Sequence, residues 1–476
     1  MNRLSSVVRL SLLGVAVVGL SACASLGGPN AATALPEQAQ SFVGQDVQLL
    51  NAPEARASAQ ERAKALLSQP LDQAAAVKLY LANSPAFQSL LAQGMADTAQ
   101  ARQSGRIANP RLSLERMSSA ADAELTRILS FGLLDVLTWP QRRRAAEHAA
   151  EASRLTLANQ VVQAVADVRQ AWVEAVAARA NLVYAQQVMD SAQASADLAA
   201  RMQRVGNITV LERATQHMYA TQASLALASA QHEVVRTRER LLRLLGLRAE
   251  QASAFQLPDR LPDLPEAPLS AAAVNAQWVG QRLDVKMAEQ DWLAAAESVG
   301  LGRIYSLTDV EWALRSTRVS ERADGASSSS RGHELSVQLP LFDWGELKRQ
   351  RLDAQTWAAA QRYEAALINA SSQVREAYSA YRTNWDVVKH YQSEVLPLRS
   401  RMSEENVYRY NGMLIGTLAL LEDARAQVAV VQSALKAQTQ FWLAEAALQT
   451  SLISNPSGAV SVGAAMASSA SSAGGH

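Results

Sequence analysis

The sequence has little of what several protein classes depend on. It contains one cysteine, which excludes a disulfide framework, and its formal net charge is +1, which gives no indication of nucleic-acid binding. Beyond the N-terminal segment, no run is long and apolar enough for a transmembrane helix. Any membrane crossing must therefore be made of β-strands. What is abundant is Ala, Leu, Gln, Glu and Arg with sparse Gly, a composition typical of long helices.

Catalytic motifs are also missing. The six histidines are scattered, and His232 with Glu233 begins a zinc-peptidase motif whose second histidine is replaced by Arg236. There is no phosphate-binding glycine loop, nucleophile elbow or cysteine pair. The sequence therefore predicts a protein that is not an enzyme and that holds no metal and no cofactor.

The single cysteine lies at the end of an export signal. Arg3 and Arg9 give residues 1–22 a basic start, and an apolar run then leads to Leu20, Ser21, Ala22 and Cys23. This is the pattern of a bacterial lipobox, and it predicts that Cys23 carries the attached lipid (palmitate among its acyl chains), which would anchor the chain. An ordinary signal peptide with a chance cysteine is the alternative. Ala24, where an Asp would resemble an inner-membrane retention signal, favours the outer membrane.

The mature chain reads as two copies of one plan. Residues 23–69 lack clear periodicity and are interpreted as an acylated tether. The first repeat, 70–268, is expected to contain a helix over 70–104, a break at Asn109 and Pro110, strands near 111–117 and 126–137, a helix from Pro140 to about 203, a turn at Gly206 and Asn207, a helix from 208 to 245 that ends at Gly246, and a proline-rich connector over 248–268.

The second repeat, 269–455, follows the same order. We expect a helix over 270–300, strands near 303–316 and 333–341 around a Gly/Ser-rich loop at 324–332, a long helix from 345 to 408, a turn at Asn411 and Gly412, and a helix to about 450. Pro397 should kink the long helix. Residues 456–476 form a Ser/Ala/Gly-rich tail that is interpreted as disordered.

A shared heptad pattern supports duplication. Apolar residues recur every seven positions from Val161 to Ala196, and a second seam from Ala164 to Ala199 consists of alanine alone. Shifting the first series by the distance from Gly206 to Gly412 lands on apolar residues from Leu367 to Met402. Small seam residues favour a wall of closely packed helices. At the usual rise per residue, a helix of ~60 residues would be roughly 90 Å long. A plain coiled-coil rod is the alternative.

The predicted strands help to choose between a wall of helices and a plain coiled-coil rod. Leu112 and Leu114 alternate with polar residues, as do Trp312 and Leu314 and, further on, Leu335 and its neighbours. One apolar and one polar face fit a strand between lipid and a wet lumen, although a half-buried soluble strand would fit as well. Four strands per chain are too few for a closed barrel, which needs about eight or more, whereas three chains would supply about twelve.

At this point the chain resembles the TolC-like outer-membrane efflux family, in particular its lipoprotein branch serving pumps of the resistance-nodulation-division type. The order, spacing and duplication of several segments carry the resemblance. They are LANSP at 81–85 with NP at 109–110, LDVLTWPQRRR at 134–144, VGNITVLERA at 205–214, RLDV at 282–285, LPLFDWG at 339–345 and YNGMLIGTLALLEDA at 410–424.

The resemblance implies a mainly α protein with a small β part. Long helical hairpins would form a periplasmic α-barrel, and four strands per protomer would join a trimeric twelve-stranded barrel in the outer membrane. The homotrimer would dock on a periplasmic adaptor (membrane fusion) protein and an inner-membrane pump, and would passively conduct substrates outward. A non-conducting periplasmic lipoprotein spacer or adaptor, and the duct of a type I protein secretion system, remain as alternatives.

The resemblance also places a closed entrance at the two hairpin turns. Glu422 matches an acidic gate position, whereas Arg425 stands where a second acid is expected, and we count Asp423 and Glu212 with them. A plain solvated surface role is the alternative for Glu422 and Arg425. The second turn, from Gly412 to Gly416, looks longer than is usual. Met202 and Met413 near the turns offer thioether ligands for an exported metal, but helix-packing methionines explain them as well.

Overall fold

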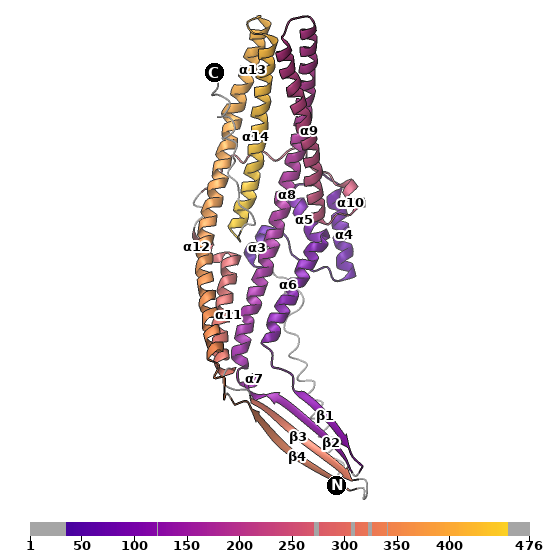
Figure 1. The fold of residues 1–476 in the computed structure, drawn as a ribbon, viewed down its shortest axis with the longest axis vertical. Coiled ribbons are helices and arrows are strands. Elements are labelled where there is room, and N and C mark those ends of the chain that lie inside the picture. Colours follow the sequence, from indigo (N-terminus) through magenta and orange to yellow (C-terminus); the bar gives the residue numbers. More distant parts are fainter. Residues whose placement is uncertain are drawn as a thin grey trace.

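The structure is a computed structural model that describes residues 35–120, 122–270, 276–305, 310–321, 326–339 and 341–455. The predicted signal over 1–22, the lipid site Cys23 and the predicted tail over 456–476 lie outside the described residues. The molecule is elongated, with a four-stranded sheet at one end and two helical hairpins at the other (Figure 1). No helix in the described ranges combines the length and the apolar character needed to cross a membrane.

The elements follow the predicted order, except that the helix predicted over 70–104 is divided at Ser84 into two helices, because Pro85 begins the second one. The first part of the chain contains α3 (Glu37–Val43), α4 (Pro53–Leu67), α5 (Gln73–Asn83), α6 (Pro85–Ser104), β1 (Arg111–Ser118), β2 (Asp122–Gly132), α7 (Leu133–Leu137), α8 (Trp139–Arg204), α9 (Val210–Leu245) and α10 (Ala249–Ala254). The second contains a 3₁₀ helix (Ala276–Gln281), α11 (Leu283–Tyr305), β3 (Val310–Glu321), β4 (Ser327–Val337), α12 (Glu346–His390), a π-helical turn (Tyr391–Val395), α13 (Leu396–Asn411) and α14 (Thr417–Ser451).

The strands differ from the prediction at their ends. The predicted strand over 126–137 stops at Gly132, and its last five residues form α7, whose Asp135 pairs with Arg142 at 2.7 Å. The predicted loop over 324–332 contains the start of β4 at Ser327. Serine is a weak strand former, so pairing with β3 outweighs local preference here.

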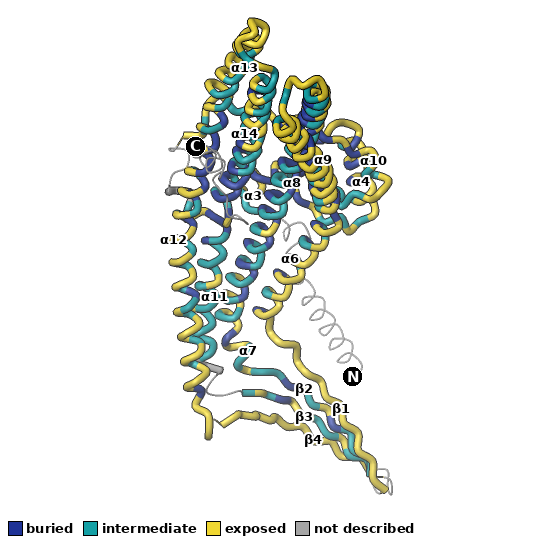
Figure 2. Tube along the Cα trace, turned by 45° about the horizontal axis from the view of Figure 1, so that its top comes forward, coloured by how far each residue is buried: buried dark blue, intermediate teal, exposed yellow. Residues whose placement is uncertain are grey.

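The long helix α8 is the spine of the molecule. Its 66 residues span about 100 Å and run from the sheet to the hairpin turn (Figure 1). Its middle third is buried against α5, α6, α9 and α11, whereas the sheet and the hairpin ends are more exposed (Figure 2). Gly94 of α6 permits close approach there, because a Cβ would lie 2.6 Å from the Leu157 side chain.

The predicted alanine seam is confirmed. Ala171, Ala178, Ala185, Ala192 and Ala199 of α8 are all buried. Beyond Ala178 the seam faces α9 and α14, where Ala192 lies in a small cluster with Ala220 and Ala223. Because these side chains are short, the helix axes lie close together and enclose little volume.

A π-helical turn marks the predicted interruption before Pro397. In it, the Leu396 backbone N–H donates to the Tyr391 carbonyl, five residues back. A proline inside a helix lacks an N–H and crowds the preceding turn, which explains the wider turn. The π turn adds one residue relative to the first repeat. This extra residue shifts the second hairpin turn by one position relative to the first.

The segment interpreted as a tether is partly folded. From residue 35 onward it contains α3 and α4, and Ala39, Phe42 and Val43 of α3 join the main core. Arg169 of α8 holds this arm, since its guanidinium donates to the Phe42 carbonyl at 2.7 Å and lies 4.1 Å from the Phe42 ring centroid. A short helix that packs through three side chains leaves no periodic signal, which is why the sequence did not predict it.

The sheet is antiparallel and follows chain order, β1-β2-β3-β4. The first repeat provides β1 and β2, the second provides β3 and β4, and the two repeats meet where β2 pairs with β3. Within the described part of the chain, each outer strand therefore has a neighbour on one side only.

A buried arginine joins the two ends of the second repeat. Arg282 is fully buried and forms a bidentate pair with Asp284 at 2.8 and 2.9 Å. It also donates to the Gln373 amide oxygen at 2.9 Å and to the backbone carbonyls of Ser451 and Ala370. The start of α11, α12 and the end of α14 are thus joined at one side chain.

We predict that Arg282→Met lowers the free energy of unfolding by about 3–5 kcal/mol, because it leaves the Asp284 carboxylate without its buried partner. Chemical denaturation followed by circular dichroism measures this change. The control is Arg382→Met, which removes a half-exposed pair with Asp386 and should cost less than about 1 kcal/mol. Equal losses in the two variants would contradict the assignment.

Candidate functional site at the tips of the helical hairpins

The two hairpins end in the same turn. In the first, the amides of Val205, Gly206 and Asn207 donate to the carbonyls of Arg201, Gln203 and Met202. In the second, the amides of Gly412, Met413 and Leu414 donate to the carbonyls of Tyr408, Tyr410 and Arg409. This is the Schellman pattern at a helix C-terminus, used twice.

The matching hydrogen bonds correct the predicted offset. Gly206 with φ +79° corresponds to Met413 with φ +58°, not to Gly412. Each loop between the flanking helices spans five positions, 205–209 and 412–416, so the second is no longer than the first. The Gly206-to-Gly412 offset holds in the body of α12, where Val374 and Tyr381 are buried, and is one residue short at the tips because of the π turn.

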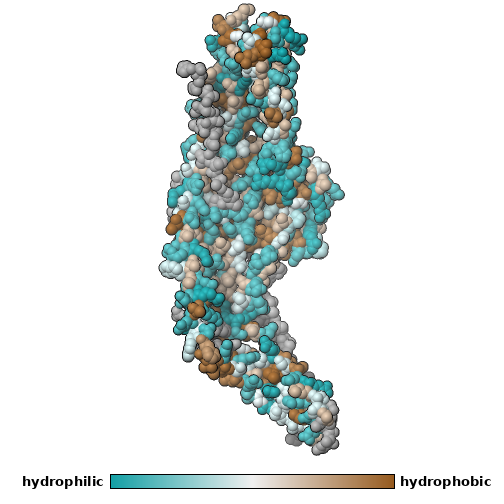
Figure 3. Space-filling model, viewed as in Figure 1, coloured by the Kyte–Doolittle hydropathy of each residue, from teal (hydrophilic) through white to brown (hydrophobic). Residues whose placement is uncertain are grey.

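Met413 therefore takes a backbone conformation that disfavours a side chain. Left-handed φ costs a non-glycine residue about 1 kcal/mol, and the Met413 side chain is 93% exposed, so its packing does not offset the cost. Val205, Val210, Leu211 and Leu414 are also mostly exposed. Together they give the hairpin ends the apolar patches at the top of Figure 3.

We predict reciprocal effects on the two turns. Met413→Gly should relieve about 1 kcal/mol of backbone strain, and Gly206→Met should introduce a similar strain. At Gly206 no atom lies within 4 Å of an added Cβ, so the backbone alone is tested. Amide hydrogen exchange at Leu414 should slow in the first variant, and exchange at Asn207 should quicken in the second. Unchanged exchange at both amides would contradict the assigned turns.

Glu212, predicted as an entrance residue, caps α9. Its carboxylate accepts from the Thr209 backbone N–H at 2.7 Å and the Thr209 hydroxyl at 2.9 Å, while the Glu212 N–H donates back to that hydroxyl. These hydrogen bonds, the backbone one first, hold the pKa of Glu212 below its usual range. The second hairpin lacks this box, because the N-cap of α14 is Gly416.

The capping box should make the start of α9 sensitive to acid. The folded-state pKa of Glu212 lies below the unfolded value, so its stabilisation is present at neutral pH and is lost as pH falls through the lowered pKa. Hydrogen exchange at the Glu212 amide, corrected for intrinsic rates, should quicken in that window. Glu212→Gln keeps the acceptor but does not titrate, so its protection should not follow pH. The same pH dependence in both proteins would overturn this role.

The acid that is held most firmly is Asp423, not Glu422. Asp423 is 8% exposed, and its carboxylate accepts from Arg399 Nη2 at 2.6 Å and from Asn406 Nδ2 at 2.8 Å. The same Arg399 nitrogen also contacts the Asp423 backbone carbonyl. Arg399 and Asn406 belong to α13 and Asp423 to α14, so this group joins the two arms of the second hairpin.

One buried oxygen and one buried nitrogen in this group have no hydrogen-bond partner among the described residues. They are Asp423 Oδ2 and Arg399 Nε. Unpaired buried polar atoms are rare in folded proteins and cost free energy.

Arg425 joins the two hairpins to each other. Its Nη2 donates to the Gln216 amide oxygen, and its guanidinium lies 4.2 Å from the centroid of the Tyr219 ring, both on α9. A second link lies further from the tip, where the Tyr184 hydroxyl donates to the Val428 carbonyl at 3.1 Å. Burial raises the pKa of Tyr184 to about 12, so this hydroxyl keeps its proton at neutral pH.

Glu422 is exposed, and no described residue forms an ion pair with it. The predicted entrance residues thus have different roles: Glu212 caps a helix, Asp423 and Arg425 hold helices together, and Glu422 stays on the surface. The sequence missed Arg399, Asn406, Gln216 and Tyr219, which contact these residues. The signal in the sequence that could have found them is their spacing along the helices, which places them on the faces that pack against the neighbouring helix.

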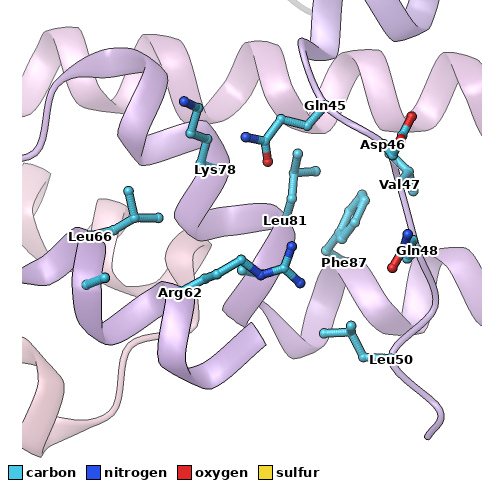
Figure 4. Close-up of a pocket in the computed structure, with 12 residues that line it drawn as sticks. Gln45, Asp46, Val47, Gln48, Leu50, Arg62, Leu66, Lys78, Leu81 and Phe87 are labelled. Atoms are coloured by element: carbon cyan, nitrogen blue, oxygen red, sulfur yellow. The ribbon is translucent and has the colours of Figure 1, made fainter. Parts of the chain in front are cut away.

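Elsewhere the described residues contain no group of His, Cys, Asp or Glu side chains arranged to hold a metal ion. A cavity of about 510 Å³ lies beside the core, between residues 45–50, α4 and α5 (Figure 4). Arg62 and Lys78 line it with the apolar Leu81 and Phe87, and Asp46 accepts from the Gln40 amide at 2.7 Å. This cavity forms where the N-terminal arm packs on the bundle.

Comparison with known proteins supports this architecture. Residues 76–247 match the outer membrane efflux protein family. Similar solved structures include CusC, a transmembrane channel, at 18% identity and TM-score 0.66, covering 83% of this chain and 92% of that chain. VceC of Vibrio cholerae (16%, TM-score 0.64, 83% and 96%) and the open state of the MtrE channel of Neisseria gonorrhoeae (17%, TM-score 0.60, 82% and 88%) are also similar. At these identities they share the fold. No curated protein matches the chain.

Proposed function

We propose that the chain, whose residues 76–247 match the model of the outer membrane efflux protein family, is one subunit of a trimeric exit duct that passively conducts substrates from the periplasm to the exterior. Docking on a periplasmic adaptor and an inner-membrane pump, and anchoring by lipid at Cys23, belong to the same proposal. The cargo could be a drug, a solvent, a metal ion or a protein.

The observation that carries the proposal is the open four-stranded sheet. One of its faces exposes Leu112, Leu114 and Leu335, which are more than 60% exposed in the single chain. Soluble proteins rarely expose such a surface, whereas a strand that faces lipid requires it. The unpaired edges of β1 and β4 cannot lie in lipid alone, so further copies of the chain must close the ring.

A belt of exposed apolar side chains lies where the sheet meets the helices, visible as the brown patch above the sheet in Figure 3. Its members are Leu137, Trp139, Leu339, Leu341, Phe342, Trp344 and Leu347. Phe342 is 99% exposed. Aromatic residues favour the boundary between lipid and water, so the belt fits the periplasmic surface of the membrane. The helical hairpins then extend away from the membrane into the periplasm.

At the far end, the hairpin links are suited to a gate. Arg425 connects α14 to α9 within a chain, and breaking that link would let the second hairpin move outward from the first. Charge-assisted hydrogen bonds contribute about 1.5–3 kcal/mol, and a cation–π contact adds about 0.5–2 kcal/mol. The exposed Glu422 remains available to pair with a neighbouring chain. Exposed apolar residues at the turns would receive the adaptor.

We predict that Arg425→Ala raises single-channel conductance in planar bilayers several-fold, because it frees the second hairpin. Glu422→Ala should have a smaller effect in the same direction. Arg401→Ala is the matched control, because Arg401 is exposed on α13 and no described residue pairs with it. Its conductance should equal that of the unmodified protein.

The outcomes separate the alternatives. Unchanged conductance in both Arg425→Ala and Glu422→Ala removes the gate and leaves the duct. Absence of discrete channels in every sample favours a non-conducting periplasmic spacer and overturns the duct.

A further inference from the structure

The sheet sorts its charged residues between two faces. Side chains of residues that pair directly across strands share a face, and alternate residues along each strand do so as well. One face, here called the arginine face, carries Arg116, Arg127, Arg318 and Arg331 and, among the described strand residues, no carboxylate. The opposite face carries Glu115, Asp122, Glu124, Glu311, Glu321 and Glu334 together with Arg111 and Arg315.

The four arginines lie in two adjacent rows of the sheet. Arg127 and Arg331 both neighbour Ser316, on opposite sides of it, and Arg116 and Arg318 both neighbour Leu125 in the next row. Strands lie about 4.8 Å apart and rows about 7 Å apart, so the guanidinium groups form one patch. All four residues are exposed, and none pairs with any other described residue. Four like charges this close repel one another unless an anion lies between them.

The same face is apolar on the side nearer the helices. The rows there contain Leu112, Leu129, Phe131, Trp312, Leu314 and Leu335, with His333 as the one polar member beside Leu314. Trp312 packs between Phe131, edge-on at 5.1 Å, and His333, stacked at 5.6 Å. The apolar rows thus lie between the belt at the sheet–helix junction and the arginines. A molecule that covers both regions must have an apolar body and an anionic end.

The free energy of placing arginine in lipid determines the depth at which such a face can lie in a membrane. An arginine on the lipid face of a barrel costs about 2–4 kcal/mol at the midplane but only about 0–1 kcal/mol near the interface. Four of them are therefore tolerable only at the outer boundary of the apolar layer, where lipid headgroups begin. Guanidinium groups bind phosphate through paired, charge-assisted hydrogen bonds.

We propose that Arg116, Arg127, Arg318 and Arg331 form a binding site for the phosphate-bearing headgroups of anionic lipids in the outer leaflet, with the acyl chains lying on the apolar rows beneath. This proposal rests on the proposed membrane location of the sheet. The site fixes the depth of the sheet in the membrane and seals the lipid against the protein.

The test counts lipids bound to the full chain by native mass spectrometry in neutral detergent, with phosphatidylglycerol and phosphatidylcholine as the probes. The unmodified protein should retain phosphatidylglycerol in preference. In the variant with all four arginines replaced by glutamine, the apparent Kd for phosphatidylglycerol should rise about tenfold or more. Replacement of all four by lysine keeps the charge and should retain most of the binding, which guards against a glutamine variant that fails to fold.

The matched control is Arg111→Gln with Arg315→Gln, on the opposite face of the same strands. It should bind phosphatidylglycerol as the unmodified protein does. Equal lipid retention in the unmodified and four-glutamine proteins would overturn the site, as would the same loss in the control. Complete displacement of the lipid by inorganic phosphate would also overturn it, since the site would then take free phosphate.

Conductance of the same samples in neutral bilayers keeps this test apart from the proposed function. A protein that conducts but binds both lipids alike disproves the lipid site and leaves the duct. A protein that never conducts disproves the duct, whatever its lipid preference.

Discussion

The architecture depends on the two open edges of one sheet. Among the described residues, β1 and β4 each have a strand neighbour on one side only, so each presents a row of backbone N–H and C=O groups without a partner strand. In lipid, each unsatisfied group would cost several kcal/mol. The chain cannot remove this cost alone, because both repeats have already given their strands. In the proposed trimer, joining β1 of one copy to β4 of the next would remove it, and three copies would give about twelve strands, within the range of known barrels.

In the proposed duct, the helices connect the ring of strands to the distant hairpin turns. α8 runs unbroken from the sheet to the first hairpin turn, so the position of the strands sets the position of the tip. Beyond the main core, its alanine seam keeps the neighbouring helices close with little side-chain volume between them. Near the turns, polar side chains hold the helices together. Arg399 contacts Asp423, and Arg425 contacts Gln216 and Tyr219.

The sequence predicted what periodicity and breakers encode. It predicted the long hairpins, the cap at Gly246 and the four strands, and its motifs indicated the resemblance to the efflux family. It missed what depends on tertiary contacts: the folded arm from residue 35, the serine-rich start of β4, and the one-residue shift at the π turn that puts Met413 in place of a glycine. At the site it indicated Glu422, Arg425, Asp423 and Glu212 as a group, but it could not tell that Asp423 is the buried, hydrogen-bonded member and Glu422 the exposed one. Partners on other helices are invisible to a single-sequence pattern.

Closure of the sheet by copies of the chain is best tested by the mass of the particle extracted from membranes in mild detergent. Native mass spectrometry should give three chain masses, held together without any disulfide between subunits. Cysteine pairs introduced on β1 and β4 should then cross-link between chains and not within one. A particle of one chain mass, or cross-links confined to single chains, would contradict the account.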